Sequence, residues 1–246
     1  SISNYTDING MKQGHWKVNF PNGKPAYIGY FKNNKPVGKF LRYNNNGKIQ
    51  SEAFFYEDGK YASIKFLDNA GKVLANGRYS DQKKDSVWHY FVENNKKVLI
   101  EEYKNGKLDG ECRTFFYPSA MVNEIINYRN NLKDGVYKKF YESGRLRLQT
   151  KYCNGIICDT MFIYFPSGRI ESIIPYANDR REGIEQNFSE SGTLLKKVPY
   201  KNGICTDPEQ QIREDQEIKK LLENKGRYLE ASQMEDPLDF LKKTQP

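Results

Sequence analysis

A repeat of about 24 residues is the feature that most constrains how this chain of 246 residues can fold. Three columns of residues recur with that period. A column of small residues, which we expect to lie in turns, contains Gly14, Gly38, Ala62, Ser86, Gly110, Gly135, Asp159 and Gly183. A second turn column follows nine residues later, at Gly23, Gly47, Gly71, Asn95, Gly144, Gly168 and Gly192, with Ser119-Ala120 in the fifth unit. The third column is aromatic in every unit: Phe31, Phe55, Tyr79, Tyr103, Tyr128, Tyr152, Tyr176 and Tyr200.

The segments between these columns have the composition of β-strands. The run Met161–Phe165, for example, is aromatic and apolar, and it ends at a Pro-Ser-Gly turn. The return segment ends at the aromatic column and is followed by Asn-Gly or Asp-Gly, as at Asn105-Gly106. These pairs supply the positive φ angles of tight hairpin turns. Each unit is therefore predicted to be a strand, a turn, a second strand and a second turn.

These units predict an all-β repeat fold: an elongated antiparallel β-meander of about eight hairpins in a single-layer twisted sheet. We expect residues 1–9 to be a lead-in, residues 10–205 the repeats and residues 206–246 a short α-helical tail. The chain is only 37% hydrophobic but contains 18 Tyr and 14 Phe. This composition favours a thin sheet held together by a structural aromatic ladder, the third column, whose rings stack in register.

Two further columns carry large side chains, two and five residues past the first turn column. Trp16 and Phe40 belong to the first of them, and Tyr43 and Phe91 to the second. An offset of three residues places the two columns on opposite faces of a regular strand. Either each strand contains a bulge, or both faces of the sheet are partly covered.

The charge is divided unevenly along the chain. The whole chain has a net charge of +8. Residues 206–246 contain seven Lys or Arg and ten Asp or Glu, a net of −3, which leaves +11 for the rest. A basic body is typical of proteins that bind acidic proteins, anionic lipid or nucleic acid. Nucleic acid is the least favoured of these partners, because the rings that would stack on bases already have a structural position in each repeat.

The tail has a helix start at Asp207-Pro208-Glu209. An apolar stripe beginning at Ile212 and a second short helix could cover the last sheet edge. The alternative is an arm that docks on a partner through Leu238, Phe240 and Leu241.

Cys153 and Cys158 flank the turn at Asn154-Gly155, so they form either a disulfide or two free thiols. A disulfide would indicate an oxidising compartment. With the chain starting at Ser1, this favours export to a periplasm or cell envelope, with the cytoplasm as the alternative. No 18-residue apolar window predicts a membrane-spanning helix.

Catalytic, metal-binding and cofactor-binding motifs are not recognisable. His15 and His89 lie in different repeats, and neither has a Cys or carboxylate at a ligand spacing. No nucleotide-binding glycine motif precedes a helix. We therefore expect a protein that is not an enzyme, with no catalytic residue, metal or cofactor.

The motifs Gly14-His15-Trp16, Gly23-Lys24 and Tyr200-Lys201-Asn202-Gly203 resemble the MORN repeat, in its bacterial variant form often labelled antitoxin-like. The sequence departs from that pattern at Asp159, at Glu185 and in the turn of the fifth unit. The resemblance implies an elongated β-meander used for protein contact or membrane association. The favoured function is a scaffold for protein–protein interaction, whose oligomeric state the sequence does not give. The alternatives are a peripheral binder of anionic lipid or envelope polymer, and an antitoxin. The most exposed rings, and so the partner-binding candidates, are expected to be Trp16, Trp88 and Phe91.

Overall fold

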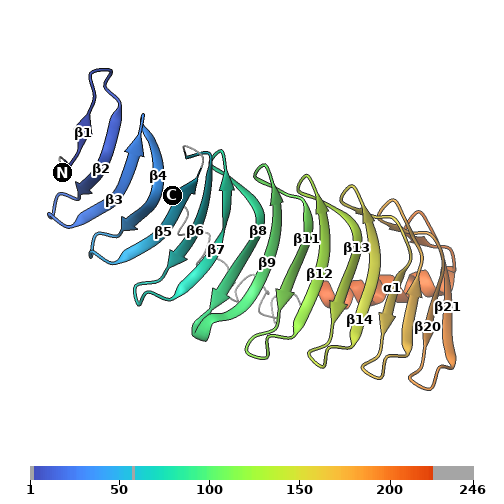
Figure 1. The fold of residues 1–246 in the computed structure, drawn as a ribbon. Helices are drawn as coiled ribbons and strands as arrows, with labels where there is room; N and C mark the ends of the chain where they lie inside the picture. Colours follow the sequence, from blue (N-terminus) through green and yellow to red (C-terminus); the bar gives the residue numbers. More distant parts are fainter. Residues whose placement is uncertain (1–2, 57–58, 224–246) are drawn as a thin grey trace.

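The computed structural model describes residues 3–56 and 59–223, and it shows an elongated, curved sheet whose hairpins follow one another in chain order (Figure 1). All strand pairs are antiparallel, which confirms the predicted β-meander repeat. The eight hairpins are β2 (Lys12–Asn19) with β3 (Pro25–Lys32), β4 (Lys35–Tyr43) with β5 (Ile49–Tyr56), β6 (Tyr61–Leu67) with β7 (Val73–Ser80), β8 (Lys83–Val92) with β9 (Lys96–Lys104), β11 (Gly110–Phe115) with β12 (Val122–Arg129), β13 (Leu132–Phe140) with β14 (Leu146–Cys153), β16 (Met161–Tyr164) with β17 (Ile170–Ile174), and β20 (Gly183–Phe188) with β21 (Leu194–Lys201).

Shorter elements complete the sheet. They are β1 (Tyr5–Thr6), β10 (Lys107–Leu108), β15 (Ile156–Ile157) and β22 (Ile204–Cys205), each paired with the nearest long strand, and the separate pair β18 (Tyr176–Ala177) and β19 (Arg180–Arg181). A 3-10 turn spans Glu93–Asn95, and the helix α1 spans Pro208–Glu223.

The turns that join one unit to the next have positive φ at both central residues, as a two-residue hairpin turn requires. These pairs are Asn33-Asn34, Asp81-Gln82, Asn105-Gly106, Asn130-Asn131, Asn154-Gly155, Asn178-Asp179 and Asn202-Gly203. Asn tolerates this conformation better than other residues with a Cβ, which explains why it recurs at the first position. The predicted use of Asn-Gly pairs is confirmed where they occur.

The first column of small residues does not form turns, and that part of the prediction is wrong. Gly14 and Gly38 lie inside β2 and β4, with φ of 67° and 65°, and Ser86 lies inside β8 with φ of 59°. The pairing between β3 and β4 shifts register at this level, between Ile28 and Tyr30. At these three positions the column marks a bend within a strand, where a positive φ changes the direction of the chain.

Each of the eight hairpins also contains a bulge on its return strand. In the second unit, Arg42 pairs with Ser51 and Tyr43 with Ile49, which leaves Gln50 as the extra residue. The same one-residue shift recurs in the other seven hairpins. Bulges bend a strand and increase its twist. This recurrence accounts for the bowed strands in Figure 1.

The two columns of large side chains lie on opposite faces, so both faces of the sheet are partly covered. Trp88 and Tyr90 belong to one buried cluster, whereas His89 stacks beside Phe91 at a ring-centroid distance of 6.4 Å. Because the bulge lies on the return strand, the alternation of the first strand is preserved. We call the face of Trp88 and Tyr90 the aromatic face, and the face of His89 and Phe91 the basic face.

The main core lies on the aromatic face, where Ala75, Trp88 and Tyr90 are buried together. Trp88 lies flat against the backbone of β7 because its neighbour there is Gly77. A Cβ at residue 77 would lie 2.3 Å from the Trp88 ring. Gly29 makes the same room for Phe40. A thin sheet can therefore bury large rings because small residues on the neighbouring strand receive them.

The helix α1 begins as the sequence predicts, because the Asp207 side chain accepts hydrogen bonds from the backbone N–H groups of Glu209 and Gln210 at 3.1 and 3.3 Å. Ile212 and Ile218 are 58% and 54% exposed, so these side chains do not seal the sheet edge. In Figure 1 the helix runs back along the length of the sheet from the last hairpin. Within residues 3–56 and 59–223, no helix is long and apolar enough to cross a membrane.

Candidate functional site

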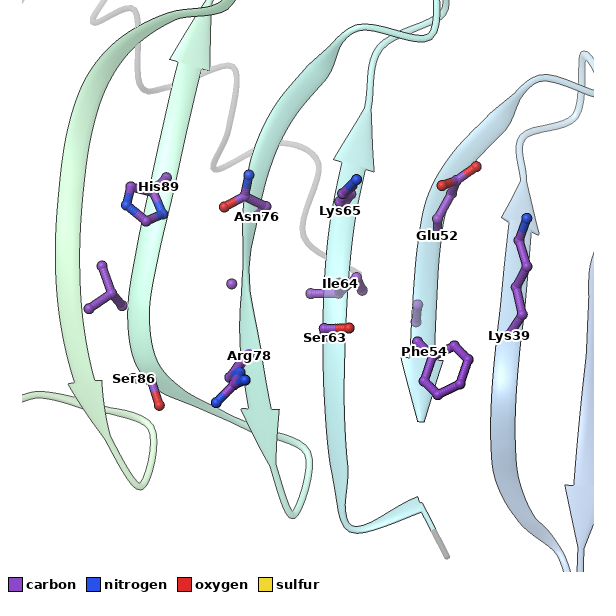
Figure 2. A pocket seen from close by; sticks show the side chains of 13 residues that line it. Lys39, Glu52, Phe54, Ser63, Ile64, Lys65, Asn76, Arg78, Ser86 and His89 are labelled. Atoms are coloured by element: carbon purple, nitrogen blue, oxygen red, sulfur yellow. The ribbon is translucent and has the colours of Figure 1, made fainter. Parts of the chain in front are cut away.

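A hollow of about 630 Å³ lies on the basic face between β4 and β8 (Figure 2). The strand register builds it from two rows of side chains. One row runs across β4 to β7 through Lys39, Phe54, Ser63 and Arg78, which pair in that order. The other row runs across β5 to β8 through Glu52, Lys65, Asn76 and His89. Neighbouring side chains in each row are about 5 Å apart at Cβ, so one ligand segment can touch several of them.

The hollow is positively charged and has an exposed apolar anchor. Its lining includes three cations, Lys39, Lys65 and Arg78, and one carboxylate, Glu52. Within the described part of the chain, no ion pair joins any of the three cations to an acidic side chain. Phe54 is 47% exposed and lies against Tyr56, with ring centroids 4.8 Å apart. Unpaired cations around an exposed ring can receive an acidic segment that also carries an apolar side chain.

His89 contributes a neutral side chain to this hollow. Partial burial, and then repulsion from Lys97, holds the pKa of His89 below its ordinary value. Glu52 and His89 lie three strands apart, which is about 14 Å at the usual strand spacing. That separation is too great for a carboxylate to orient a histidine for acid–base chemistry.

The aromatic face contains a second concavity, of about 450 Å³, which we call the aromatic groove. The large apolar side chains that line it are Phe31, Phe40, Phe55, Ile64, Phe66 and Tyr79. Two of the described residues in its lining are charged, Arg42 and Lys60, and both are cationic. The groove therefore combines an apolar floor with a basic rim.

The rings of this face alternate between two columns. Trp16, Phe31, Phe40 and Phe55 form a chain of edge-to-face contacts with centroid distances of 6.0, 5.8 and 5.9 Å. Tyr79 meets Trp88 in the same way at 5.1 Å, and Tyr137 meets Tyr152 at 5.9 Å. In these contacts the third-column rings therefore meet rings that lie two residues past the first column, such as Trp16 and Phe40, rather than one another. This corrects the expectation that Phe31 through Tyr200 stack directly, and the edge-to-face geometry follows from the ring quadrupole.

A partly buried polar network lies on the aromatic face. The phenol groups of Tyr90 and Tyr103 donate hydrogen bonds to the same oxygen of Glu101, at 2.6 and 2.7 Å. Lys84 donates to the Tyr90 oxygen at 2.9 Å, and its ammonium lies 4.8 Å from the centroid of Trp88. Burial and the neighbouring Glu101 carboxylate raise the pKa of both tyrosines, and burial lowers the pKa of Lys84. The polar groups of this network form hydrogen bonds with one another, so we assign the network a structural role.

The predicted partner-binding residues fare differently. Trp88 is only 1% exposed, because Gly77 receives its ring, so the expectation that Trp88 is among the most exposed rings is wrong. Trp16 is half-buried under the ammonium of Lys12, which lies 4.7 Å from its centroid, and Phe91 is half-buried beside His89. Leu238, Phe240 and Leu241 lie outside the described residues.

The cysteines divide into one pair and two single thiols. Cys153 and Cys158 are joined by a disulfide across the Asn154-Gly155 turn. Cys112 and Cys205 are buried and free, and burial raises the pKa of Cys112 to about 11. No group of three or more His, Cys, Asp or Glu side chains within the described ranges could hold a metal ion.

Sequence reasoning missed the cations of the hollow, although a signal was present. The position three residues past the first column is basic in several units: Lys17, Lys65, His89, Arg113 and Lys138. Strand alternation places that position opposite to Trp88 and its equivalents. A basic column out of phase with the aromatic columns was therefore sufficient to predict the basic face.

Comparison with known proteins supports the repeat. The family model described as the MORN repeat variant matches residues 12–33, 36–58, 133–154 and 181–202. No curated protein matches the sequence. Among solved structures, the crystal structure of TarM is similar over 48% of this chain and 21% of that chain, with 12% identity and a TM-score of 0.30. A mutant of S. aureus TarM in complex with fondaparinux, alpha-GlcNAc-glycerol and UDP is similar over 50% of this chain and 21% of that chain, with 11% identity and a TM-score of 0.25.

This chain therefore spans about a fifth of either TarM structure, and at these TM-scores the likeness carries no argument about function. The four family matches each fall on a hairpin or on the junction between two hairpins of the sheet. They come from both ends of the repeat array, and the units between them have the same bulge on the return strand and the same third-column ring. The chain therefore contains MORN-variant repeats at these four places.

Proposed function

We propose that this repeat scaffold is non-catalytic and binds an acidic segment of a partner protein in the hollow of the basic face. The observation that carries the proposal is the set of three cations, Lys39, Lys65 and Arg78, that line one hollow with the exposed ring of Phe54 and form no ion pair with an acidic side chain among the described residues. Long side chains with this charge, held in register on a rigid sheet, can meet carboxylates spaced along an extended peptide. The half-exposed phenylalanine supplies an apolar contact at the centre.

The extended sheet supports binding better than chemistry. The hollow is shallow and its ionisable groups lie on separate strands, so it presents a row of contacts rather than a convergent set of reactive groups. An antitoxin would be one protein of this class, with an acidic toxin as its partner. The disulfide at Cys153 and Cys158 is compatible with an exported scaffold, which we keep as part of the proposal.

The test is a comparison of two charge-reversed variants of the full chain. The hollow variant carries Lys39→Glu, Lys65→Glu and Arg78→Glu. The control variant carries Lys138→Glu, Lys151→Glu and Lys197→Glu on the same face outside the hollow, so both change the net charge by −6. A stoichiometric protein captured from native extract should be lost at least tenfold from the hollow variant and be retained by the control.

Anionic lipid is the competing ligand of the same chemistry, and the same proteins distinguish it. Vesicles of phosphatidylglycerol are mixed with the wild type and both variants and then sedimented. Binding to vesicles that both variants lose equally, together with no captured protein, would overturn the proposal in favour of a peripheral membrane role. Capture that neither variant alters would show that the basic face is not the binding surface.

A further inference from the structure

The aromatic groove is an apolar concavity that the described residues leave open. Phe31, Phe55, Phe66 and Tyr79 line it and are only half-buried, and two of them, Phe66 and Tyr79, also pack against the buried cluster around Trp88. A volume of about 450 Å³ falls within the range of sites that hold a ligand or a few side chains. Half-buried rings of this kind gain stability if another apolar segment covers them.

The charges at this groove select for an acidic occupant. Arg42 and Lys60 lie at its rim, and the described residues that line it include no carboxylate. The ammonium of Lys60 lies 5.1 Å from the centroid of Tyr61, so it is held at the sheet surface. An apolar segment with several acidic residues would match both the floor and the rim.

The helix α1 directs the end of the chain towards this groove. It begins three residues after Cys205, which is buried with Val198 and Tyr200 on the aromatic face. Its 16 residues extend about 24 Å, the width of about five strands, and Figure 1 shows it running towards the N-terminal repeats. The helix therefore ends near the level of β13, about seven strands or roughly 34 Å from the centre of the groove at β5.

The sequence after α1 has the required composition. Residues 228–241 contain four acidic side chains, Glu230, Glu235, Asp236 and Asp239, and no Lys or Arg. Their apolar side chains are densest at Leu238, Phe240 and Leu241. Leu238 is 15 residues beyond Glu223, and an extended chain of that length spans about 50 Å. The segment therefore has ample length to reach the groove.

We propose that residues 234–241 of this same chain occupy the aromatic groove, with Leu238, Phe240 and Leu241 against its rings and the acidic residues beside Arg42 and Lys60. The covalent tether holds the segment near the groove at an effective concentration of roughly millimolar, so even a weak contact is occupied. A partner that uses the groove must first displace the tail. This self-occupancy is separate from the proposed function, which uses the opposite face.

The experiment places the photoreactive residue p-benzoylphenylalanine at position 240 of the full chain. After irradiation, we expect crosslinks to peptides within residues 25–82 on the aromatic face. Equal mixing of 14N-labelled and 15N-labelled protein should give no mixed-isotope crosslink, because the contact is within one chain. The control carries the same probe at Tyr228, which is five residues past α1 and can extend only about 17 Å, so it should give no crosslink to Phe40.

Two charge-reversed backgrounds complete the test. Arg42→Glu with Lys60→Glu should lower the crosslinking yield at least fivefold. Lys39→Glu with Lys65→Glu, on the opposite face, should leave the yield within twofold. Crosslinks to the basic face, mixed-isotope crosslinks between two copies, or no crosslink within residues 25–82 would each overturn the proposal. None of these outcomes depends on whether an external partner binds the hollow, so the two proposals fail independently.

Discussion

Replacing Gly77 with alanine should destabilise the protein through a single contact. The backbone of Gly77 does not have a positive φ, so alanine is compatible with its conformation. The added Cβ would lie 2.3, 2.4 and 2.6 Å from three atoms of the Trp88 ring, where ordinary contacts are about 3.5–4.0 Å. The ring must therefore move by more than 1 Å from a site in which it is 1% exposed.

The cost of that movement lies between two limits. Overpacking that the surroundings absorb costs about 1–3 kcal/mol. Complete loss of a buried tryptophan costs about 3–5 kcal/mol. Since Trp88 is also held by Tyr79 at 5.1 Å and donates its indole N–H to the Arg78 carbonyl at 3.0 Å, its freedom to shift is small. We expect a loss of about 2–4 kcal/mol in the free energy of unfolding.

Tryptophan fluorescence during urea unfolding measures this effect directly. The chain has two tryptophans, so Trp16→Phe leaves Trp88 as the only reporter. Gly77→Ala in that background should shift the emission to longer wavelength and lower the unfolding midpoint. The steric cause is tested against Trp88→Leu, in which the same Gly77→Ala change should cost less than about 1 kcal/mol. A Gly77→Ala protein with unchanged emission and a loss below about 0.5 kcal/mol would refute the close-packing argument.

Three further outcomes follow from the buried polar groups. Glu101→Gln should cost about 1.5–3 kcal/mol in urea unfolding, because two phenol groups lose a charged acceptor, whereas Glu52→Gln on the open face should stay within about 0.5 kcal/mol. Because the pKa of Tyr103 is raised in the folded protein, the unfolded chain releases the phenol proton at a lower pH, and the free energy of unfolding falls as the pH rises above about 10. Tyr103→Phe should reduce this fall between pH 8 and pH 11. An unchanged dependence of stability on pH would contradict the assignment. With its pKa raised to about 11, the Cys112 thiol should resist iodoacetamide at pH 8 in the native protein and react after unfolding, as followed by mass spectrometry.

The architecture was readable from the sequence because its turns are local. Asn105-Gly106 and its equivalents specify a two-residue hairpin wherever they occur, and their recurrence fixes the repeat. The first column was misinterpreted because a positive φ can either reverse the chain in a turn or bend it within a strand. At Gly38 it bends a strand instead of reversing it, and only the pairing of β3 with β4 distinguishes the two cases. That pairing depends on the neighbouring unit, so no single segment reveals it.

The candidate site was less accessible to sequence reasoning. The large aromatic residues suggested an exposed binding surface at Trp88, but the exposure of a ring depends on the size of the residue opposite it on the neighbouring strand. Gly77 lies 11 residues earlier, and it removes this ring from solvent. The hollow, in contrast, needs side chains from five strands, β4 to β8, brought into two rows by their register. The column of basic residues could be seen in the sequence, but the sequence did not show that Lys39, Lys65 and Arg78 line one hollow.

The separation of the two faces explains how a sheet one layer thick can be both stable and available for binding. On the aromatic face, rings such as Phe40 contact the neighbouring strand so closely that stability depends on them. On the basic face, the charged ends of Lys39 and Lys65 project away from these contacts, so changing them alters the surface potential with little effect on packing. Alternation along each strand keeps the two sets apart in every unit. The same array can therefore accept changes in its binding residues while it retains the ring contacts between repeats, such as Phe40 against Gly29 and Trp88 against Gly77.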